Sequence, residues 1–142
     1  MFLLDTNVVS ELRKARAGRA DKHVAAWAAG ASAASMFVSV ITIQELEIGV
    51  LLAERRDPTQ GAILRQWLAK QVLPAFAERI IPVDTAVARR SAMLHVPDPR
   101  PVRDSLIAAT AMVHGLAVVT RNVGDFRPMG AELVDPWQAT DA

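Results

Sequence analysis

Residues 2–8 read Phe-Leu-Leu-Asp-Thr-Asn-Val, a short apolar run that meets a carboxylate and then polar side chains before apolar residues return. Such a run is typical of a strand buried on both faces, and the polar residues after it are typical of a turn into a helix. Similar runs, mostly rich in β-branched or aromatic residues, lie at residues 36–38, 80–83 and 117–120, with a possible fifth at 132–134. These runs are the predicted strands.

Helix-length segments separate the predicted strands. They cover residues 8–15, 21–29, 41–55, 59–73, 85–95 and 102–114. Pro58 suits a first helical position after Asp57, Asp84 can cap the following helix, and Gly115 can end the last long one. The alternation of strands and helices predicts an α/β fold, with a parallel sheet of four or five strands, helices on both faces, and one domain over residues 1–142.

The composition excludes several classes of protein. With 142 residues, 51% of them hydrophobic and 22% charged, the chain is not intrinsically disordered. A net charge of +1 gives no global field that would attract nucleic acid or membranes, so any such contact must be local. The absence of cysteine excludes disulfides and thiolate metal sites. No secretory leader pattern and no membrane-length apolar stretch is present, so we expect a cytoplasmic protein with no membrane contact.

Two carboxylates directly follow predicted strands. Asp5 ends the first apolar run, and Asp125 lies in the Thr-Arg-Asn-Val-Gly-Asp-Phe stretch, residues 120–126, after the fourth. Ligands of open parallel sheets bind beyond the carboxyl ends of the strands, so both are candidate site residues. Each also has a structural interpretation, because Asp5 or Asn7 can cap the first helix and Asp125 can belong to a turn.

A third carboxylate, Glu45, falls on an unexpected side of its predicted helix. At about 100° per residue it lies among Ile41, Ile48 and Leu52, away from the polar stripe. An unpaired ion in an apolar arc costs several kcal/mol, roughly, unless a cation meets it. Glu45 is therefore either a buried acid paired with an arginine or a ligand in a site.

The fourth carboxylate, Asp104, stacks with Ile107, Ala108 and Ala111 at helical spacing, while Arg103 and Thr110 belong to the opposite, solvated face. An acidic residue in the first turn also complements the helix dipole, which is the structural alternative. The neighbouring alanines indicate close packing.

In a parallel α/β sheet, all four carboxylates can converge on one edge. They cannot ionise together without a countercharge, because each raises the pKa of the others. A divalent metal would resolve this, and oxygen ligands without cysteine favour Mg²⁺ or Mn²⁺ over Zn²⁺. Such an ion activates water and takes up charge on a phosphoryl oxygen, so phosphodiester hydrolysis is the natural chemistry.

The chain resembles the PIN-domain ribonucleases, and most closely the toxin half of VapBC-type toxin–antitoxin pairs. The resemblance rests on specific motifs in order and spacing over nearly the whole chain. They are residues 3–8 with Ser10 and Glu11, residues 39–45, residues 104–111, and residues 120–122 with Asp125 and Phe126.

The resemblance implies a metal-dependent endoribonuclease acting as the toxin of its pair, with Mg²⁺ or Mn²⁺ held by four acidic ligands that position the attacking water: Asp5, Glu45, Asp104 and Asp125. It also implies that Thr6 and Asn7, and less strongly Thr120, orient the carboxylates or the water. Some relatives carry an acidic residue where Asn122 stands, so both one-metal and two-metal chemistry remain open. A homodimer and a small antitoxin whose C-terminal segment blocks the groove are implied as well.

Other residues add less. Arg121 and Arg103 flank the acidic motifs and could hold the RNA backbone, although a solvated surface position explains them equally well. His23, His95 and His114 show no metal-ligand spacing, so we interpret them as surface or packing residues.

Three other functions remain open. A phosphotransfer enzyme of the haloacid-dehalogenase type would use Asp5 as nucleophile, but those enzymes carry a second aspartate where Asn7 stands. A receiver-like or metal-binding interaction module would hydrolyse nothing, and a full set of four acidic ligands argues against it. A DNA-directed nuclease could use the same site, because nothing in the sequence identifies a contact to the RNA 2′-hydroxyl.

Overall fold

The structure, a computed structural model, describes residues 1–139 of the chain. Five strands form one sheet in the order β3-β2-β1-β4-β5, and every neighbouring pair is parallel. The strands are β1 (Phe2–Leu4), β2 (Met36–Ser39), β3 (Ile80–Ile81), β4 (Ala117–Val119) and β5 (Leu133–Val134). The predicted α/β fold with a parallel sheet is confirmed, and the N-terminal apolar run is its central strand.

Helices connect the strands. They are α1 (Thr6–Leu12), α2 (Lys22–Gly30), α3 (Val40–Arg56), α4 (Pro58–Trp67), α5 (Leu73–Ala75), α6 (Thr85–Leu94), α7 (Val102–His114) and α8 (Val123–Phe126). Short 3₁₀ turns lie at η1 (Ala15–Ala17), η2 (Ala33–Ser35) and η4 (Arg127–Met129), and a π-helical turn, η3 (Leu68–Val72), joins α4 to α5. Within residues 1–139, no helix is both long and apolar enough to cross a membrane.

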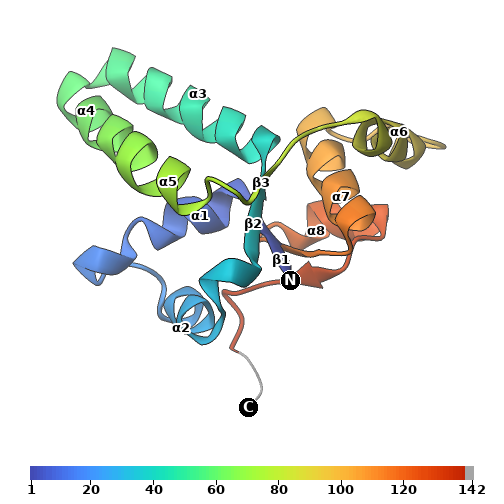
Figure 1. Ribbon diagram of the computed structural model, residues 1–142, viewed down its shortest axis with the longest axis horizontal. Coiled ribbons are helices and arrows are strands. Elements are labelled where there is room, and N and C mark those ends of the chain that lie inside the picture. Colours follow the sequence, from blue (N-terminus) through green and yellow to red (C-terminus); the bar gives the residue numbers. More distant parts are fainter. Residues whose placement is uncertain (140–142) are drawn as a thin grey trace.

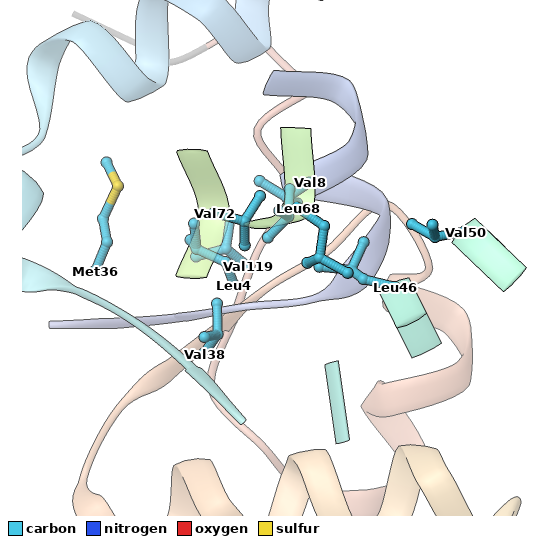
Figure 2. Close-up of a cluster of buried hydrophobic side chains, with 10 residues drawn as sticks. Leu4, Val8, Met36, Val38, Leu46, Val50, Leu68, Val72 and Val119 are labelled. Carbon is cyan, nitrogen blue, oxygen red and sulfur yellow. The ribbon is translucent and has the colours of Figure 1, made fainter. Parts of the chain in front are cut away.

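Helices cover both faces of the sheet, as predicted. Figure 1 shows the sheet nearly edge-on, with α1 to α5 to one side and α6 to α8 to the other. Successive strand residues point to opposite faces, so Leu4 packs with α1, α3 and η3, whereas Leu3 packs with α7 and α8. Figure 2 shows the first of these clusters, in which Val8, Leu68 and Val72 gather over Leu4 and Val119.

The boundaries of the first helix differ from the prediction of 8–15. Helix α1 begins at Thr6 because Asp5 occupies the N-cap position, where its carboxylate accepts a hydrogen bond from the Thr6 N–H at 2.8 Å. It ends at Leu12, and η1 follows and closes on Gly18, whose φ of 67° is in the left-handed region. The predicted capping role of Asp5 is thus confirmed, and it does not prevent the carboxylate from belonging to a site.

Other boundaries follow from proline and from helix caps. Strand β3 stops at Ile81, two residues before the predicted end, because Pro82 has no N–H for the ladder. The predicted helix over 59–73 widens into η3 before Pro74, which cannot donate to the preceding turn. The first helical position of Pro58, the cap by Asp84 and the end of α7 at Gly115 are as predicted, and Asp57 also caps α4.

Candidate functional site

The carboxyl ends of β1 and β4 bring together two polar residues that are far apart in the sequence. Leu4 is in register with Val119, so Asp5 and Thr120 follow side by side. The Thr120 hydroxyl donates a hydrogen bond to Asp5 Oδ2 at 2.8 Å. Asp5 is 6% exposed and Thr120 is fully buried. This pair forms the floor of the candidate site.

Further hydrogen bonds fix the Asp5 carboxylate from the start of α1. Asn7 Nδ2 lies 3.4 Å from both Asp5 Oδ2 and Thr120 Oγ1, and Asn7 Oδ1 accepts from the Arg121 N–H at 3.3 Å. The Asn122 N–H donates to Thr120 Oγ1 at 3.0 Å. The residues after β1 and those after β4 therefore form one connected network around Asp5.

Glu45 reaches this network from α3. Ser39, fully buried at the end of β2, caps α3 by accepting from the Ile41 N–H at 3.0 Å, which sets where the helix begins. Glu45 lies on the second turn, and its Oε1 accepts a hydrogen bond from the Thr6 hydroxyl at 2.7 Å. Thr6 thus orients a carboxylate, the role that the family resemblance implied for it.

The structural alternative for Glu45 was burial beside an arginine. Arg103 does approach, with its Nη1 at 3.7 Å from Glu45 Oε2, but the Arg103 side chain is 52% exposed and that of Glu45 is 25% exposed. This is a wide, solvent-facing pair and not an ion pair inside the core. The expected apolar arc of α3 is also only partly buried, because Leu52 is 59% exposed where α3 extends beyond the sheet and pairs with α4.

Asp104 lies in the first turn of α7, half-buried. Burial raises the pKa of its carboxyl to about 6, and the charges of Asp5, Asp125 and Glu45 act in the same direction. Thr110, which we expected on the solvated face of this helix, is fully buried. That prediction was wrong, since the sequence of one helix does not show which neighbour will cover it.

Asp125 is held by a short helix and not by the simple turn that its Gly-Asp context indicates. Helix α8 places Asp125 on the outside and Phe126, with no exposed surface, in the core beside α7. The charge of Asp125 raises the pKa values of Asp5 and Asp104. All four predicted carboxylates therefore belong to one electrostatic cluster, although Asp125 lies at its exposed edge.

The pKa of Asp5 is also raised, by burial first, with Glu45 and Asp125 adding to the effect. The hydrogen bonds from Thr120 and from the Thr6 backbone act against this shift because they stabilise the ionised form. Burial nevertheless outweighs them.

A cavity of about 260 Å³ opens over these groups. It is lined by Asp5, Thr6, Asn7, Glu45, Asp104 and Asn122. Asn122 was noted in the sequence only as a replacement for an acid, yet its place directly after β4, beside β1, could have indicated a lining residue. The cavity presents carboxylate and amide oxygens, which suit a hard cation or a group carried by one.

The two arginines of interest flank the site differently. Arg103 precedes Asp104 on α7 and faces Glu45, as described above. The Arg121 guanidinium lies over the Trp137 ring, 5.3 Å from its centroid, while the Arg121 N–H is bonded to Asn7. Both side chains are largely exposed.

The chain is similar to known proteins over nearly its full length. It is 36% identical over 143 residues to a protein of Sinorhizobium fredii named VapC ribonuclease Y4jK, covering 97% of this chain and 99% of that protein. Its fold matches the crystal structure of FitAcB from Neisseria gonorrhoeae with a TM-score of 0.86, at 34% identity, over 96% of this chain and 99% of that one. It also matches a toxin–antitoxin complex from Klebsiella pneumoniae with a TM-score of 0.66, at 26% identity, over 96% and 98% of the two chains.

A family model extends this similarity to the site. The model described as PIN domain matches residues 2–130, which include β1 and all four clustered carboxylates. The resemblance inferred from the sequence motifs is confirmed: the chain belongs to the PIN-domain family.

Proposed function

We propose that the protein is a metal-dependent endoribonuclease that acts as the toxin of a toxin–antitoxin pair. The observation that carries this proposal is the cluster of four carboxylates beyond the carboxyl ends of β1 and β4: Asp5, Glu45 and Asp104 line a shared cavity, and the charge of Asp125 acts on Asp5 and Asp104. Within residues 1–139, the salt bridge to these carboxylates is the one between the half-exposed Arg103 and Glu45. The ribonuclease class agrees with the name of the relative from Sinorhizobium. Residues 1–142 would form one nuclease domain, of which residues 140–142 lie outside the part that the structure describes.

The residues present fit a hard dication. Within residues 1–139, no three His, Cys, Asp or Glu side chains already form a ready-made metal site, so a bound ion would have to draw the carboxylates inward. The donors are nevertheless oxygen ligands of the type that Mg²⁺ and Mn²⁺ prefer, and their mutual repulsion favours a cation among them. Asp5, Glu45, Asp104 and Asp125 would hold the ion. When bound, it would polarise the scissile phosphate and lower the pKa of the attacking water.

The chain's own residues would prepare this chemistry. Thr120 and Asn7 hold the Asp5 carboxylate in a fixed orientation, and Thr6 does the same for Glu45. These hydrogen bonds fix the orientation of both carboxylates before any ion binds, although the ion would still have to draw the carboxylates closer together. Asn122 is neutral where an acid would strengthen a second site, which leaves one-metal and two-metal chemistry to be counted by titration.

The RNA backbone would lie across the opening of the cavity. Arg103 and Arg121 flank the cavity-lining residues Asp104 and Asn122 in sequence, and their exposed guanidinium groups are available to phosphates. Replacing either with glutamine is expected to weaken RNA binding and to lower its salt dependence by about one released counterion. Equal salt dependence of the variants and the unmodified protein would remove these two residues from the RNA contact.

We further propose a small antitoxin partner and a homodimer. The fold match to a toxin–antitoxin complex supports the antitoxin, and the family resemblance supports the dimer. Co-purification with the product of an adjacent small gene, and the mass of the purified protein in solution, test these two statements separately.

The decisive experiment incubates purified protein, freed of any antitoxin, with structured and unstructured RNA in the presence of Mg²⁺, Mn²⁺ or a chelator. Asp104→Asn is assayed in parallel, with single-stranded DNA as a second substrate. Metal-dependent RNA cleavage that is lost in the variant supports the proposal. Equal cleavage by the variant rejects the site, and cleavage of DNA alone rejects the substrate class.

Two results would favour the alternatives. Metal binding without cleavage of any nucleic acid would favour a binding module. A phosphorylated Asp5 would favour phosphotransfer.

A further inference from the structure

Three polar side chains meet where α6 packs against α7: those of Ser91, His95 and Ser105, the residue that follows Asp104. Ser105, fully buried, lies 3.0 Å from Ser91 Oγ and 3.0 Å from His95 Nε2, and its hydroxyl donates to the Val102 carbonyl at 2.7 Å. His95 Nδ1 accepts from the Arg100 N–H at 3.2 Å. From the sequence, His95 was expected only at the surface or in packing, and the proposed site does not explain this network.

The network has one consistent arrangement of protons. The Arg100 N–H can only donate, so His95 Nδ1 is the acceptor and the proton of the neutral ring is on Nε2. That proton is directed to Ser105 Oγ, and the single Ser105 proton is directed to the Val102 carbonyl. Ser91 must then donate the remaining hydrogen bond to Ser105. Every member is satisfied, which makes the arrangement rigid.

The network ties down the first turn of α7, which has no side-chain cap. The N-cap residue of α7 is Pro101, which provides no capping side chain, and the loop before it contains Pro97 and Pro99. The first turn is instead tied down by Ser105, through Val102 within the turn and through His95 outside it. Asp104 lies in this same turn, immediately before Ser105.

This turn needs an anchor because its acidic residue is repelled. Within residues 1–139, no side-chain hydrogen bond to the Asp104 carboxylate is present, and three other carboxylates push against it. A first turn without a cap would move outward under that repulsion, and a shift of about 1 Å is enough to disturb a site of this kind.

We propose that His95, acting through Ser105, is a positioning residue that holds the first turn of α7 and thereby places Asp104 in the carboxylate cluster. This inference rests on the proposed function, because placement of Asp104 matters if it binds a metal. It assigns His95 no contact with the substrate or the ion.

The test measures Mn²⁺ binding directly, by the Mn²⁺ electron paramagnetic resonance signal, in the full chain without RNA. His95→Phe and Ser105→Ala are each expected to weaken Mn²⁺ binding by about 10-fold or more, the usual effect of removing the support of a ligand. Because His95 acts through Ser105, the double variant is expected to bind about as weakly as the weaker single variant. His95→Gln, whose amide can donate to Ser105 from the position of Nε2, is expected to recover part of the affinity.

Thr110→Val is the matched control. Thr110 is fully buried in the same helix and its hydroxyl donates to the Leu106 carbonyl at 2.7 Å, so the variant loses a buried hydrogen bond without disturbing the first turn. It is expected to melt at a lower temperature with Mn²⁺ affinity within about twofold of the unmodified protein. A purely structural role for His95 would give His95→Phe this same pattern.

The outcomes separate the two proposals. If the unmodified protein binds Mn²⁺, and His95→Phe and His95→Gln both bind it as tightly as the unmodified protein does, the positioning role is wrong and the proposed function stands. If the unmodified protein binds no Mn²⁺, the proposed function fails and the inference fails with it. If His95→Phe does not fold, His95→Gln and Ser105→Ala decide, and unchanged Mn²⁺ affinity in both overturns the inference.

Discussion

Asp5 and Asp104 line the same cavity, but they are held in different ways. Asp5 follows the central strand, is nearly inaccessible to solvent and accepts hydrogen bonds from Thr120, the Thr6 backbone and Asn7. Asp104 lies on a helix, is half-buried and, within the described residues, accepts no side-chain hydrogen bond. Burial raises both pKa values, but only at Asp5 do hydrogen bonds act against that shift.

This difference separates two tasks of the site. The hydrogen-bond donors around Asp5 stabilise its ionised carboxylate whether or not an ion is bound in the cavity. Asp104 has no such donors within the described residues and is repelled by the neighbouring carboxylates, so it keeps its proton up to a pH of about 6. We therefore expect the two residues to be equally necessary for catalysis and to respond differently to pH and to changes in stability.

The largest expected effect is on cleavage. Asp5→Asn and Asp104→Asn each remove one anionic ligand, so each is expected to lower the rate of RNA cleavage by at least about 1000-fold. Glu78→Gln is the control, because Glu78 is exposed and precedes β3 at the opposite end of the sheet. If either aspartate variant cleaves RNA at more than a tenth of the rate of the unmodified protein, that aspartate is not needed for cleavage and the prediction is wrong.

The second effect is on metal binding as a function of pH. With a pKa of about 6 in the metal-free protein, Asp104 is protonated below that pH and must release its proton to bind an ion. The Mn²⁺ affinity is therefore expected to fall by about tenfold per pH unit below pH 6 and to level off above it. Titrations between pH 4.5 and 8 test this, and a constant affinity from pH 5 to 7 would contradict it.

A smaller effect on Mn²⁺ binding is expected when a hydrogen bond to Asp5 is removed. Thr120→Val removes the hydroxyl that donates to Asp5, so the pKa of Asp5 is expected to rise further and Mn²⁺ affinity to fall by about 10-fold. The fall is expected to be greater at low pH, since Asp5 then holds its proton more firmly. Thr120→Ser keeps the hydroxyl and is expected to restore binding; a serine variant as weak as the valine variant would indicate lost packing instead.

The smallest effect concerns stability without metal. The folded-state pKa of Asp104 exceeds its ordinary value of 3.8, so the folded protein binds the proton more tightly and loses stability as pH rises from about 4 to 6. Asp104→Asn removes this loss. Since the side chain is half-exposed, we expect a gain of about 1 kcal/mol at pH 7.5, a rise in Tm of a few degrees, and none below pH 4. A lower Tm for the variant at pH 7.5 would contradict the repulsion.

The strand-end residues of the site could be predicted more fully than the helical ones. Asp5 directly follows a strand of three apolar residues, and its position could be predicted because ligands of open parallel sheets bind beyond the carboxyl ends of the strands. Thr120 follows by the same rule from the neighbouring strand. Their mutual hydrogen bond requires only that β1 and β4 be neighbours in register.

The helical residues could be identified but not placed. Glu45 was singled out because it leaves the polar stripe of its helix, yet the buried stripe of α3 runs through Thr42, Leu46 and Val50, beside the expected arc. Thr110 was expected to be solvated and is fully buried. Periodicity shows that a helix has two sides, and only the neighbouring helices determine which side is covered.

The sequence by itself determined the parallel α/β fold, the four acidic residues and the family, because strand pattern, chain order and motif spacing are local properties. The tertiary structure decided which carboxylate is stabilised by hydrogen bonds and which is left to repulsion, and it revealed that His95 contacts Ser105. These are contacts between side chains from different elements. Their energies depend on distances and burial that arise only when the helices pack on the sheet.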